Sequence, residues 1–166
     1  TELAKWYLQE PPLCLWSNDD EVVDIGSLGV EDATPSKVSS ALHIPSNQIS
    51  AVLQSEAFAQ GKVWVQGETA QRAGAMLELK PGDRALDVCA APGTKAMQLA
   101  RKGASVIACD LSARRLSLMV PEMHRQGGGL PIQLVACDGG SALADGELFE
   151  GVLVDAPCSN TGVLGA

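Results

Sequence analysis

The stretch Arg84-Ala-Leu-Asp-Val-Cys-Ala-Ala-Pro-Gly-Thr-Lys95 decides the fold of this chain. Its first half, through Cys89, is apolar enough to form a buried strand, and a helix is predicted from Thr94 to Lys102, where Gly103 ends it. A Pro-Gly turn joins the two elements. A strand that leads through a tight turn into a helix indicates a β-α-β unit, and therefore a parallel sheet.

The same alternation continues toward the end of the chain. Further strands are predicted at 105–109, 133–137 and 151–155, together with a helix at 112–126 that Pro121 should bend or interrupt. The pattern is weakest at 141–149, where a short helix would have to fit. Strands and helices at this spacing predict an α/β fold with a Rossmann-like sheet of about four parallel strands.

The residues before 81 have a mixed pattern. A strand is predicted at 13–17, and a helix is predicted from Thr34 and Pro35 through Leu42, because Thr suits an N-cap and Pro suits the first helical position. A strand at 62–66 and an amphipathic helix at 68–79 follow. We therefore interpret 1–61 as a small α+β subdomain, 62–80 as a connecting strand and helix, and 81–166 as the N-terminal part of the larger domain. Because residue 1 is not Met, the chain is expected to begin inside a longer sequence.

The net charge of −8 weakens the case for a polyanionic partner without excluding it. Eight acidic residues and a single lysine lie in 1–34, so the acidity is mostly an N-terminal property. No apolar run approaches the roughly 20 residues that span a bilayer, which argues against a membrane protein. The five cysteines contain no close pair of the kind that zinc sites use, so neither a metal nor a disulfide framework is expected. Free thiols suit a reducing intracellular compartment, which could be cytoplasm, nucleolus or an organelle.

An aspartate stands at or beside the end of each predicted strand of the larger domain: Asp87, Asp110, Asp138 and Asp155. Ligands of open α/β sheets bind outside the carboxyl ends of the strands. At such an edge Asp110 can accept both hydroxyls of a ribose, and Asp138 can accept from the amino group of an adenine. The loop at 89–93 lacks the glycines of a dinucleotide or phosphate-binding loop. The set therefore predicts a nucleoside ligand without phosphates that bears an amino acid tail, namely S-adenosylmethionine.

A thiol follows the last of these carboxylates. Pro157 stops the strand that ends at Asp155, so Asp155 and Cys158 are delivered together to the ligand edge of the sheet. An acid and a thiol in that position are typical of an active site. Trp16 and Trp64, by contrast, are interpreted as packing residues.

The motifs of this chain resemble those of the RNA 5-methylcytosine methyltransferases, a family that includes the bacterial 16S ribosomal RNA enzyme and nucleolar and organellar relatives. The loop Cys-Ala-Ala-Pro-Gly and the strand end Asp-Ala-Pro-Cys-Ser are highly specific in combination. The matching segments are Val65-Gln-Gly-Glu-Thr-Ala-Gln71, Lys80-Pro-Gly-Asp83, Asp87–Lys95, Asp110-Leu-Ser112, Arg114-Arg-Leu116, Cys137-Asp138 and Asp155-Ala-Pro-Cys-Ser-Asn-Thr-Gly-Val-Leu164.

The resemblance implies a class I methyltransferase fold, S-adenosylmethionine as cofactor and RNA as partner, with ribosomal RNA favoured and protein assembly partners also possible. It implies that Asp110 holds the ribose and Asp138 the adenine. Lys95 and Asp155 would contact the target cytosine, and Cys158 would be the thiol that helps release the product. The residues implied to hold the methionine part or to lie beside it are Asp87, Cys89, Ala90, Ala91, Pro92, Gly93, Thr94, Lys95 and Asp155.

The chemistry accounts for these residue types. Carbon 5 of cytosine is a poor nucleophile, so a thiolate first adds to carbon 6, a base later removes the carbon 5 proton, and the thiol leaves. An acid near the ring nitrogen, placed at Asp155, would assist addition, while Lys95 could stabilise developing charge or hold the base. In the family the attacking cysteine belongs to a later Thr-Cys-Ser segment, which is expected beyond Ala166. Only four of the family's seven strands are expected in this chain.

Two departures leave an alternative open. The family usually has Gly where Thr94 and Asn160 stand, and basic residues where Gly165 and Ala166 stand. Because of Thr94, Asn160 and the acidic N-terminal region, a catalytically inactive, methyltransferase-like scaffold for RNA binding or ribosome assembly is the second hypothesis. A methyltransferase of small molecules or proteins is a third and weaker one, because such sites rarely need Pro-Cys beside Lys95.

Overall fold

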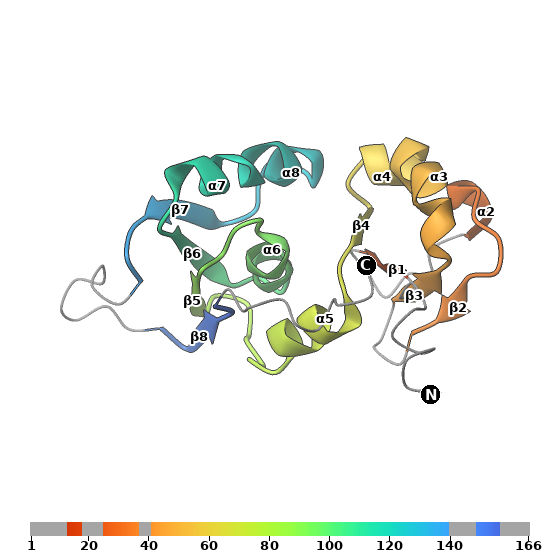
Figure 1. Cartoon of the computed structure of the whole chain (residues 1–166). Coiled ribbons are helices and arrows are strands. Elements are labelled where there is room, and N and C mark those ends of the chain that lie inside the picture. Colours follow the sequence, from red (N-terminus) through yellow and green to blue (C-terminus); the bar gives the residue numbers. More distant parts are fainter. Residues whose placement is uncertain (1–12, 18–24, 37–40, 140–148, 157–166) are drawn as a thin grey trace, which may run out of the picture. The chain divides into compact units, whose positions relative to one another are not determined.

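The computed structural model describes residues 13–17, 25–36, 41–139 and 149–156. They form two compact units, one made of the described residues up to Gly67 and the other spanning Glu68–Ala156. Figure 1 labels their helices and strands in chain order. Within the described ranges, none of the helices has the length and apolar character that crossing a membrane requires.

The first unit is built on a four-stranded antiparallel sheet in the order β2-β3-β1-β4. Leu15, Ile44 and Val63 point from this sheet into one apolar core, which Leu28 and Val52 complete. The strands are β1 (Leu13–Ser17), β2 (Thr34–Pro35), β3 (Leu42–Ile44) and β4 (Val63–Val65), and the helices are α2 (Ile25–Leu28), the 3-10 turn η1 (Ser46–Gln48), α3 (Ile49–Gln54) and α4 (Glu56–Ala59). The predicted strands at 13–17 and 62–66 are confirmed, and β4 pairs with β1 in this sheet.

Two tryptophans face each other across the paired strands β1 and β4. Trp16 lies opposite Trp64, with the ring centroids 6.0 Å apart and the planes inclined by 13°. The indole N–H of Trp64 donates to the Oε1 atom of Gln66 at 3.3 Å, and both residues are buried. The interpretation of Trp16 and Trp64 as packing residues is confirmed.

The helix predicted from Thr34 through Leu42 is wrong. Thr34 and Pro35 form β2, which pairs with His43 and Leu42 of β3, and the Ser36 N–H donates to the carbonyl of Ala41 at 2.8 Å. The capping preference of Thr-Pro was overridden because Leu42 and Ile44 alternate into the core, as a strand requires. Tertiary burial therefore decided what the local pattern left ambiguous.

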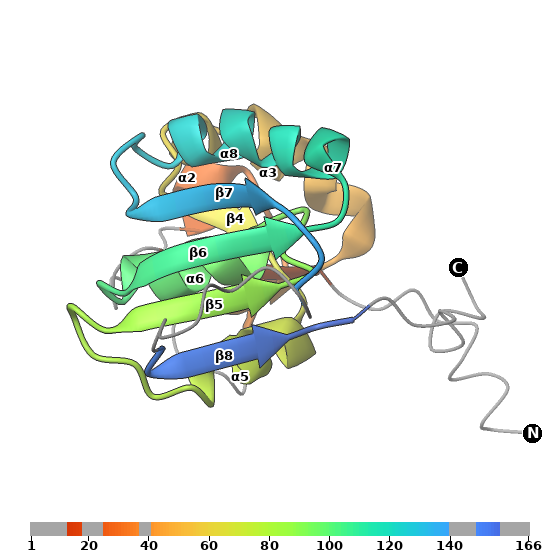
Figure 2. The ribbon, with the colours of Figure 1, turned by 90° about the vertical axis from the view of Figure 1, so that its left-hand side faces the viewer.

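The second unit is built on a four-stranded parallel sheet in the order β7-β6-β5-β8. Its strands are β5 (Arg84–Val88), β6 (Ser105–Asp110), β7 (Ile132–Ala136) and β8 (Gly151–Val154), and its helices are α5 (Glu68–Ala75), α6 (Thr94–Arg101), α7 (Ala113–Ser117) and α8 (Met119–Arg125). Figure 2 shows the four strands side by side with their arrowheads at one edge and with α6 behind them. The predicted α/β class and the four parallel strands are confirmed.

Small and aliphatic side chains fill the space between this sheet and α6. Ala85 and Ala108 of the sheet and Ala96 and Leu99 of α6 are fully buried in one cluster. Small residues let α6 lie close to the strands, which brings the start of the helix near the carboxyl ends of β5 and β6. The core therefore fixes the position of the turn at 89–93, which joins β5 to α6.

The predicted helices differ from the observed ones at their ends. The helix expected at 112–126 is two helices, α7 and α8, which meet at Leu118. The break precedes Pro121 by three residues, because a proline cannot donate a hydrogen bond to the preceding turn. The helix expected at 68–79 ends at Ala75, and Glu78 takes a left-handed backbone conformation (φ +43°). Within the stretch 141–149, Phe149 is not helical, and the rest lies outside the described residues.

Candidate functional site

The four predicted carboxylates lie at or near the carboxyl ends of the parallel strands. Asp87 is the fourth residue of β5, Asp110 ends β6, and Asp155 follows β8 directly. Asp138 comes two residues after β7. Because all four strands run in one direction, these positions share the edge that carries the arrowheads in Figure 2. This is the edge at which ligands of such sheets bind.

The turn after β5 is held tightly against β6. The Ala90 N–H donates to the carbonyl of Cys109 at 2.8 Å, and the Gly93 N–H donates to the carbonyl of Ala90 at 2.7 Å. Gly93 has φ +100°, and a Cβ atom there would lie 2.5 Å from the Cε atom of Met119. Glycine is therefore required at this position both for the backbone conformation and for space. The turn ends at Thr94, where α6 begins.

Asp87 is buried without a hydrogen bond. The residue is 1% exposed, and neither carboxylate oxygen has a hydrogen-bond partner in the described structure. Burial raises the pKa of Asp87 to about 7; the Lys95 ammonium lowers it, the Asp155 carboxylate raises it, and the backbone N–H of Ala96 lowers it. A buried carboxylate in this state calls for a proton or a cationic partner.

Lys95 is paired with Asp155 instead. The Nζ atom of Lys95 donates to the Oδ2 atom of Asp155 at 2.5 Å. The lysine side chain is 17% exposed and the aspartate side chain is 58% exposed, so the pair lies at the boundary between the protein and solvent. The structure thus brings together Lys95 and Asp155, which were both predicted to contact the substrate.

Asp110 is buried like Asp87, but one of its oxygens accepts a hydrogen bond and its carboxylate has an arginine partner. Its Oδ1 atom accepts the backbone N–H of Ser112 at 3.0 Å, and Nη1 of Arg115 lies 3.2 Å from its Oδ2 atom. The Nη2 atom of Arg115 also donates to the carbonyl of Ala91 at 2.8 Å. Arg115 therefore joins the end of β6 to the turn after β5.

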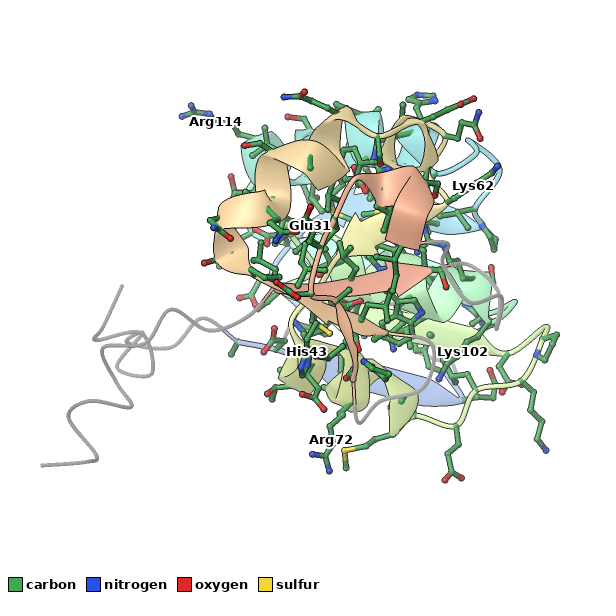
Figure 3. The ribbon with its side chains drawn as sticks, turned by 90° about the vertical axis from the view of Figure 1, so that its right-hand side faces the viewer. Glu31, His43, Lys62, Arg72, Lys102 and Arg114 are labelled. Carbon is green, nitrogen blue, oxygen red and sulfur yellow. The ribbon has the colours of Figure 1, made fainter. Side chains whose placement is uncertain are left out.

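The role of Arg115 was not predicted, although it lies within a segment that carries the family resemblance. Its neighbour Arg114 is exposed and extends away from the ribbon in Figure 3. Two adjacent arginines on a short helix give no sequence signal as to which one turns inward. The spacing from Asp110, five residues along the chain, is the one feature that could have pointed to Arg115.

Apolar surface lies beside the carboxylates. Leu111 follows Asp110 and is 79% exposed. Asp138 is exposed, and the N–H of the preceding Cys137 donates to the carbonyl of Asp110 at 3.0 Å. The ends of β6 and β7 are therefore joined directly below this surface. No role was predicted for Leu111.

Two thiols lie near the carboxyl ends of neighbouring strands, Cys109 in β6 and Cys137 directly after β7. The pKa of the Cys109 thiol is raised to about 12, first by burial and then by the hydrogen bond with Cys137, the proximity of Cys137 and the charge of Asp87. Cys109 is therefore protonated and chemically inert at neutral pH. Cys158, the predicted catalytic thiol, lies outside the described residues. Among the residues that are described, no group of three or more His, Cys, Asp and Glu side chains is arranged to hold a metal ion.

Solved structures share this fold. The protein PH0851 covers 95% of the chain with a TM-score of 0.79 and 29% sequence identity, and the chain covers 37% of that protein. A methyltransferase homologue from Pyrococcus horikoshii covers 96% of the chain with a TM-score of 0.73 and 22% identity, and the chain covers 55% of it. The parallel sheet with its strand-end carboxylates is thus a class I methyltransferase fold.

Sequence comparison gives the family. The model of the 16S rRNA methyltransferase RsmB/F family matches residues 74–166, which is more than half of the chain, so the chain belongs to that family. It is 45% identical over 112 residues to ribosomal RNA small subunit methyltransferase B of Pseudomonas putida, a match that covers 64% of the chain and 25% of the relative. The protein of the same description from Klebsiella pneumoniae is 31% identical over 177 residues, with 98% of the chain and 39% of the relative covered. The chain thus spans between a quarter and two fifths of these relatives.

Proposed function

We propose that the complete protein transfers a methyl group from S-adenosylmethionine to carbon 5 of cytosine in ribosomal RNA. The observation that carries this proposal is the set of carboxylates at one sheet edge, with the Lys95–Asp155 ion pair beside them. Family membership supports it, because the matching relatives are described as ribosomal RNA methyltransferases. The same support disfavours the alternative of an inactive scaffold.

The residues of the edge fit the cofactor. Asp87 offers a buried carboxylate without a partner, which suits the ammonium group of an amino acid tail. The carboxylate of Asp110, fixed by Ser112 and Arg115, is suited to accept ribose hydroxyls, and Asp138 is suited to accept an adenine amino group. Leu111 offers exposed apolar surface for the face of the base. When bound, S-adenosylmethionine supplies an electrophilic methyl group carried by a sulfonium sulfur.

The turn supplies the remaining cofactor contacts in this proposal. Ala90 and Ala91 are small, Gly93 leaves no side chain above the turn, and Thr94 opens α6. Cys89 and Pro92 complete the loop between strand and helix. The threonine at 94, where the family usually has glycine, adds a side chain beside the cofactor and is expected to lower its affinity without removing the site.

Lys95 and Asp155 are placed to handle the cytosine. Asp155 holds the ammonium of Lys95 through its Oδ2 atom and is more than half exposed, so its other oxygen can accept from a polar edge of a base. Lys95 supplies a fixed positive charge next to that position. The pair can thereby orient the ring and stabilise negative charge that develops on it.

Thiol chemistry completes the reaction. Cys158 stands three residues after Asp155 and is proposed to assist release of the methylated base. The attacking thiolate is proposed to come from the Thr-Cys-Ser segment of the complete protein. It adds to carbon 6 of the cytosine; after methylation the carbon 5 proton is removed and the bond between carbon 6 and sulfur breaks.

The first unit is proposed to contact RNA. In this proposal 1–61 is an RNA-binding-like subdomain, 62–80 is the connecting strand and helix, and 81–166 is the start of the cofactor-binding domain. With a ribosomal substrate the protein would act in an intracellular, reducing compartment, and protein assembly partners belong to the same proposal.

Bisulfite mapping of ribosomal RNA tests the proposed function. Cells that lack the protein should lose methylation at a specific cytosine, and the complete wild-type protein should restore it. Asp155→Asn should fail to restore it, whereas Asp83→Asn, which changes a carboxylate at the opposite end of β5, should succeed. Unchanged methylation in the cells that lack the protein would refute the proposal.

Replacing Cys158 tests whether this thiol assists release of the product while the thiol of the Thr-Cys-Ser segment attacks carbon 6. Cys158→Ala should accumulate a covalent adduct between protein and RNA, detectable by denaturing electrophoresis, because the attacking thiol is intact but release is slow. Cys137→Ala, which removes a thiol that is itself half-buried and has no proposed catalytic role, should not accumulate the adduct. If Cys158→Ala forms no adduct and transfers no methyl group, Cys158 is itself the attacking residue.

A further inference from the structure

Asp87 is the one described carboxylate of the ligand edge that is buried with both oxygens unpartnered. It lies in the middle of the sheet, between β6 on one side and β8 on the other. The turn of small residues that follows leaves the carboxylate close to the space where the amino acid tail of the cofactor is proposed to lie. Among the described residues, neither oxygen of Asp87 has a partner at normal hydrogen-bond geometry, so a cationic group of the ligand is a suitable partner.

The charged and titratable groups that face Asp87 come from three elements. Lys95 of α6 favours its ionised form, whereas Asp155, after β8, and the thiol of Cys109 in β6 do not. Lys95 makes its close contact with Asp155, at 2.5 Å, and so its charge is largely committed. The backbone N–H of Ala96, at the start of α6, also favours the ionised form, but its effect is smaller than that of Lys95 or of Asp155. In the ligand-free protein, one cation is thus shared unequally between two carboxylates.

We propose that Asp87 holds a proton while the cofactor site is empty and releases that proton to solvent when the ammonium group of the ligand enters. This inference rests on the proposed function, because it takes S-adenosylmethionine as the ligand. The ammonium keeps its own protons and donates a hydrogen bond to the newly ionised carboxylate. One proton is therefore lost for each cofactor bound, and no bond of the cofactor changes.

The consequence is a cofactor affinity that depends on pH in the physiological range. Burial raises the pKa of Asp87 to about 7, so at pH 6 most of the empty protein must lose a proton before it can bind. Affinity should then rise about fivefold from pH 6 to pH 7 if the bound carboxylate stays ionised. In this interval the amino group of the ligand stays largely protonated, so the change belongs to the protein.

Isothermal titration calorimetry of the complete protein with S-adenosylhomocysteine tests this coupling. Titrations at pH 6 in two buffers of different ionisation enthalpy should show release of about 0.9 proton, falling to about 0.5 proton at pH 7. The neutral nucleoside 5′-methylthioadenosine, which lacks the amino acid tail, should bind with no proton release. Equal release with both ligands would overturn the proposal, because the proton would then come from another group.

Variants and a direct titration identify the group that releases the proton. Asp87→Asn should abolish both proton release and the pH dependence of the affinity, whereas Asp83→Asn should keep both. If Asp87→Asn does not fold, carbon-13 NMR of the aspartate carboxyls in the wild-type protein gives the same information. A titration midpoint of Asp87 below 5 in the empty protein would overturn the proposal.

The outcomes separate this inference from the proposed function. Binding of S-adenosylhomocysteine that is independent of pH and releases no proton would overturn the coupling and leave the methyltransferase function standing. Failure of the complete protein to bind S-adenosylhomocysteine at any pH would overturn both.

Discussion

The ends of β5 and β6 each carry a buried aspartate, but the two carboxylates have opposite surroundings. Asp110 accepts a backbone N–H and is paired with Arg115, whereas Asp87 has no hydrogen-bond partner among the described residues. Burial raises the pKa of Asp87 to about 7. The partners of Asp110, by contrast, are the backbone of Ser112 and the side chain of Arg115. The difference shows that the partners of a strand-end carboxylate can come from the protein, as at Asp110, or can be left for a ligand to supply, as we propose for Asp87.

The turn between β5 and α6 is tightly packed, so Gly93→Ala should have the largest effect, which is on the stability of the fold. The new Cβ would lie 2.5 Å from Met119 in a backbone with φ +100°, which combines overpacking and strain to cost about 3 to 5 kcal/mol of unfolding free energy. Gly82→Ala is the matched control, because φ is +92° there but nothing lies within 4 Å of the new Cβ. It should cost only about 1 to 2 kcal/mol. Chemical denaturation measures both, and equal losses would show that the space above the turn is not tight.

Asp110→Asn should have the next largest effect, on cofactor binding. The amide can accept fewer hydrogen bonds and leaves Arg115 without its ion pair, so cofactor affinity should fall about 100-fold. Calorimetry with S-adenosylhomocysteine measures the loss. Unchanged affinity would refute the proposed contact between Asp110 and the ribose.

Asp87→Asn should stabilise the empty protein, in contrast to Asp110→Asn. The folded-state pKa of about 7 exceeds the unfolded value of 3.8, so the folded state binds an extra proton between about pH 4 and 7, and stability falls as the pH rises through this window. Asp87→Asn removes that fall. It should raise the unfolding free energy at pH 7.5 by about 1 to 3 kcal/mol, less than the full cost of burying the charge because the amide also lacks partners.

Denaturant titrations of both proteins at pH 5 and pH 7.5 measure this effect. The wild-type protein should lose stability relative to Asp87→Asn between the two values. A variant that is less stable than the wild type at pH 7.5 would mean that Asp87 already has a partner in the empty protein.

Arg115→Lys should have the smallest effect, because the side chain is half exposed and its ion pair is screened by solvent. The lysine would keep the charge near Asp110 but lose the hydrogen bond to the Ala91 carbonyl, so cofactor affinity should fall about threefold to fivefold. Arg114→Lys is the control, since Arg114 points away from the ribbon (Figure 3) and should leave affinity unchanged. Equal effects of the two substitutions would show that the bridge from Arg115 to the turn does not matter for binding.

The sequence was sufficient for the parallel sheet of the second unit and for its strand-end carboxylates, although not for the ends of its helices. Buried strands, the Pro-Gly turn and the strand-end aspartates recur with a spacing that only a parallel sheet satisfies. It was insufficient for Thr34 and Pro35, which were predicted to begin a helix. They form a strand instead, because Leu42 and Ile44 of the paired strand are packed in the core. A strand of two or three residues is too short to show a clear alternating pattern in the sequence, so tertiary burial decides its secondary structure.

Within the site, the residue types were predictable but their pairing was not. The sequence placed Lys95 and Asp155 at the same edge, yet their contact depends on how α6 and β8 approach each other across sixty residues of chain. The lack of a hydrogen-bond partner for the Asp87 carboxylate and the hydrogen bond from Arg115 to the Ala91 carbonyl also depend on side-chain geometry, which the spacing of residues in the sequence does not reveal. Electrostatic states of this kind follow from the folded environment and not from composition.

The most direct test of the central claim is single-turnover transfer of a labelled methyl group from S-adenosylmethionine to 16S ribosomal RNA by the complete protein. The wild-type protein should produce 5-methylcytosine, and Asp155→Asn should slow its formation by about 100-fold or more, because Lys95 loses the carboxylate that holds it. Transfer at an equal rate by both proteins, or a methyl group on any atom other than carbon 5 of cytosine, would contradict the proposed active site.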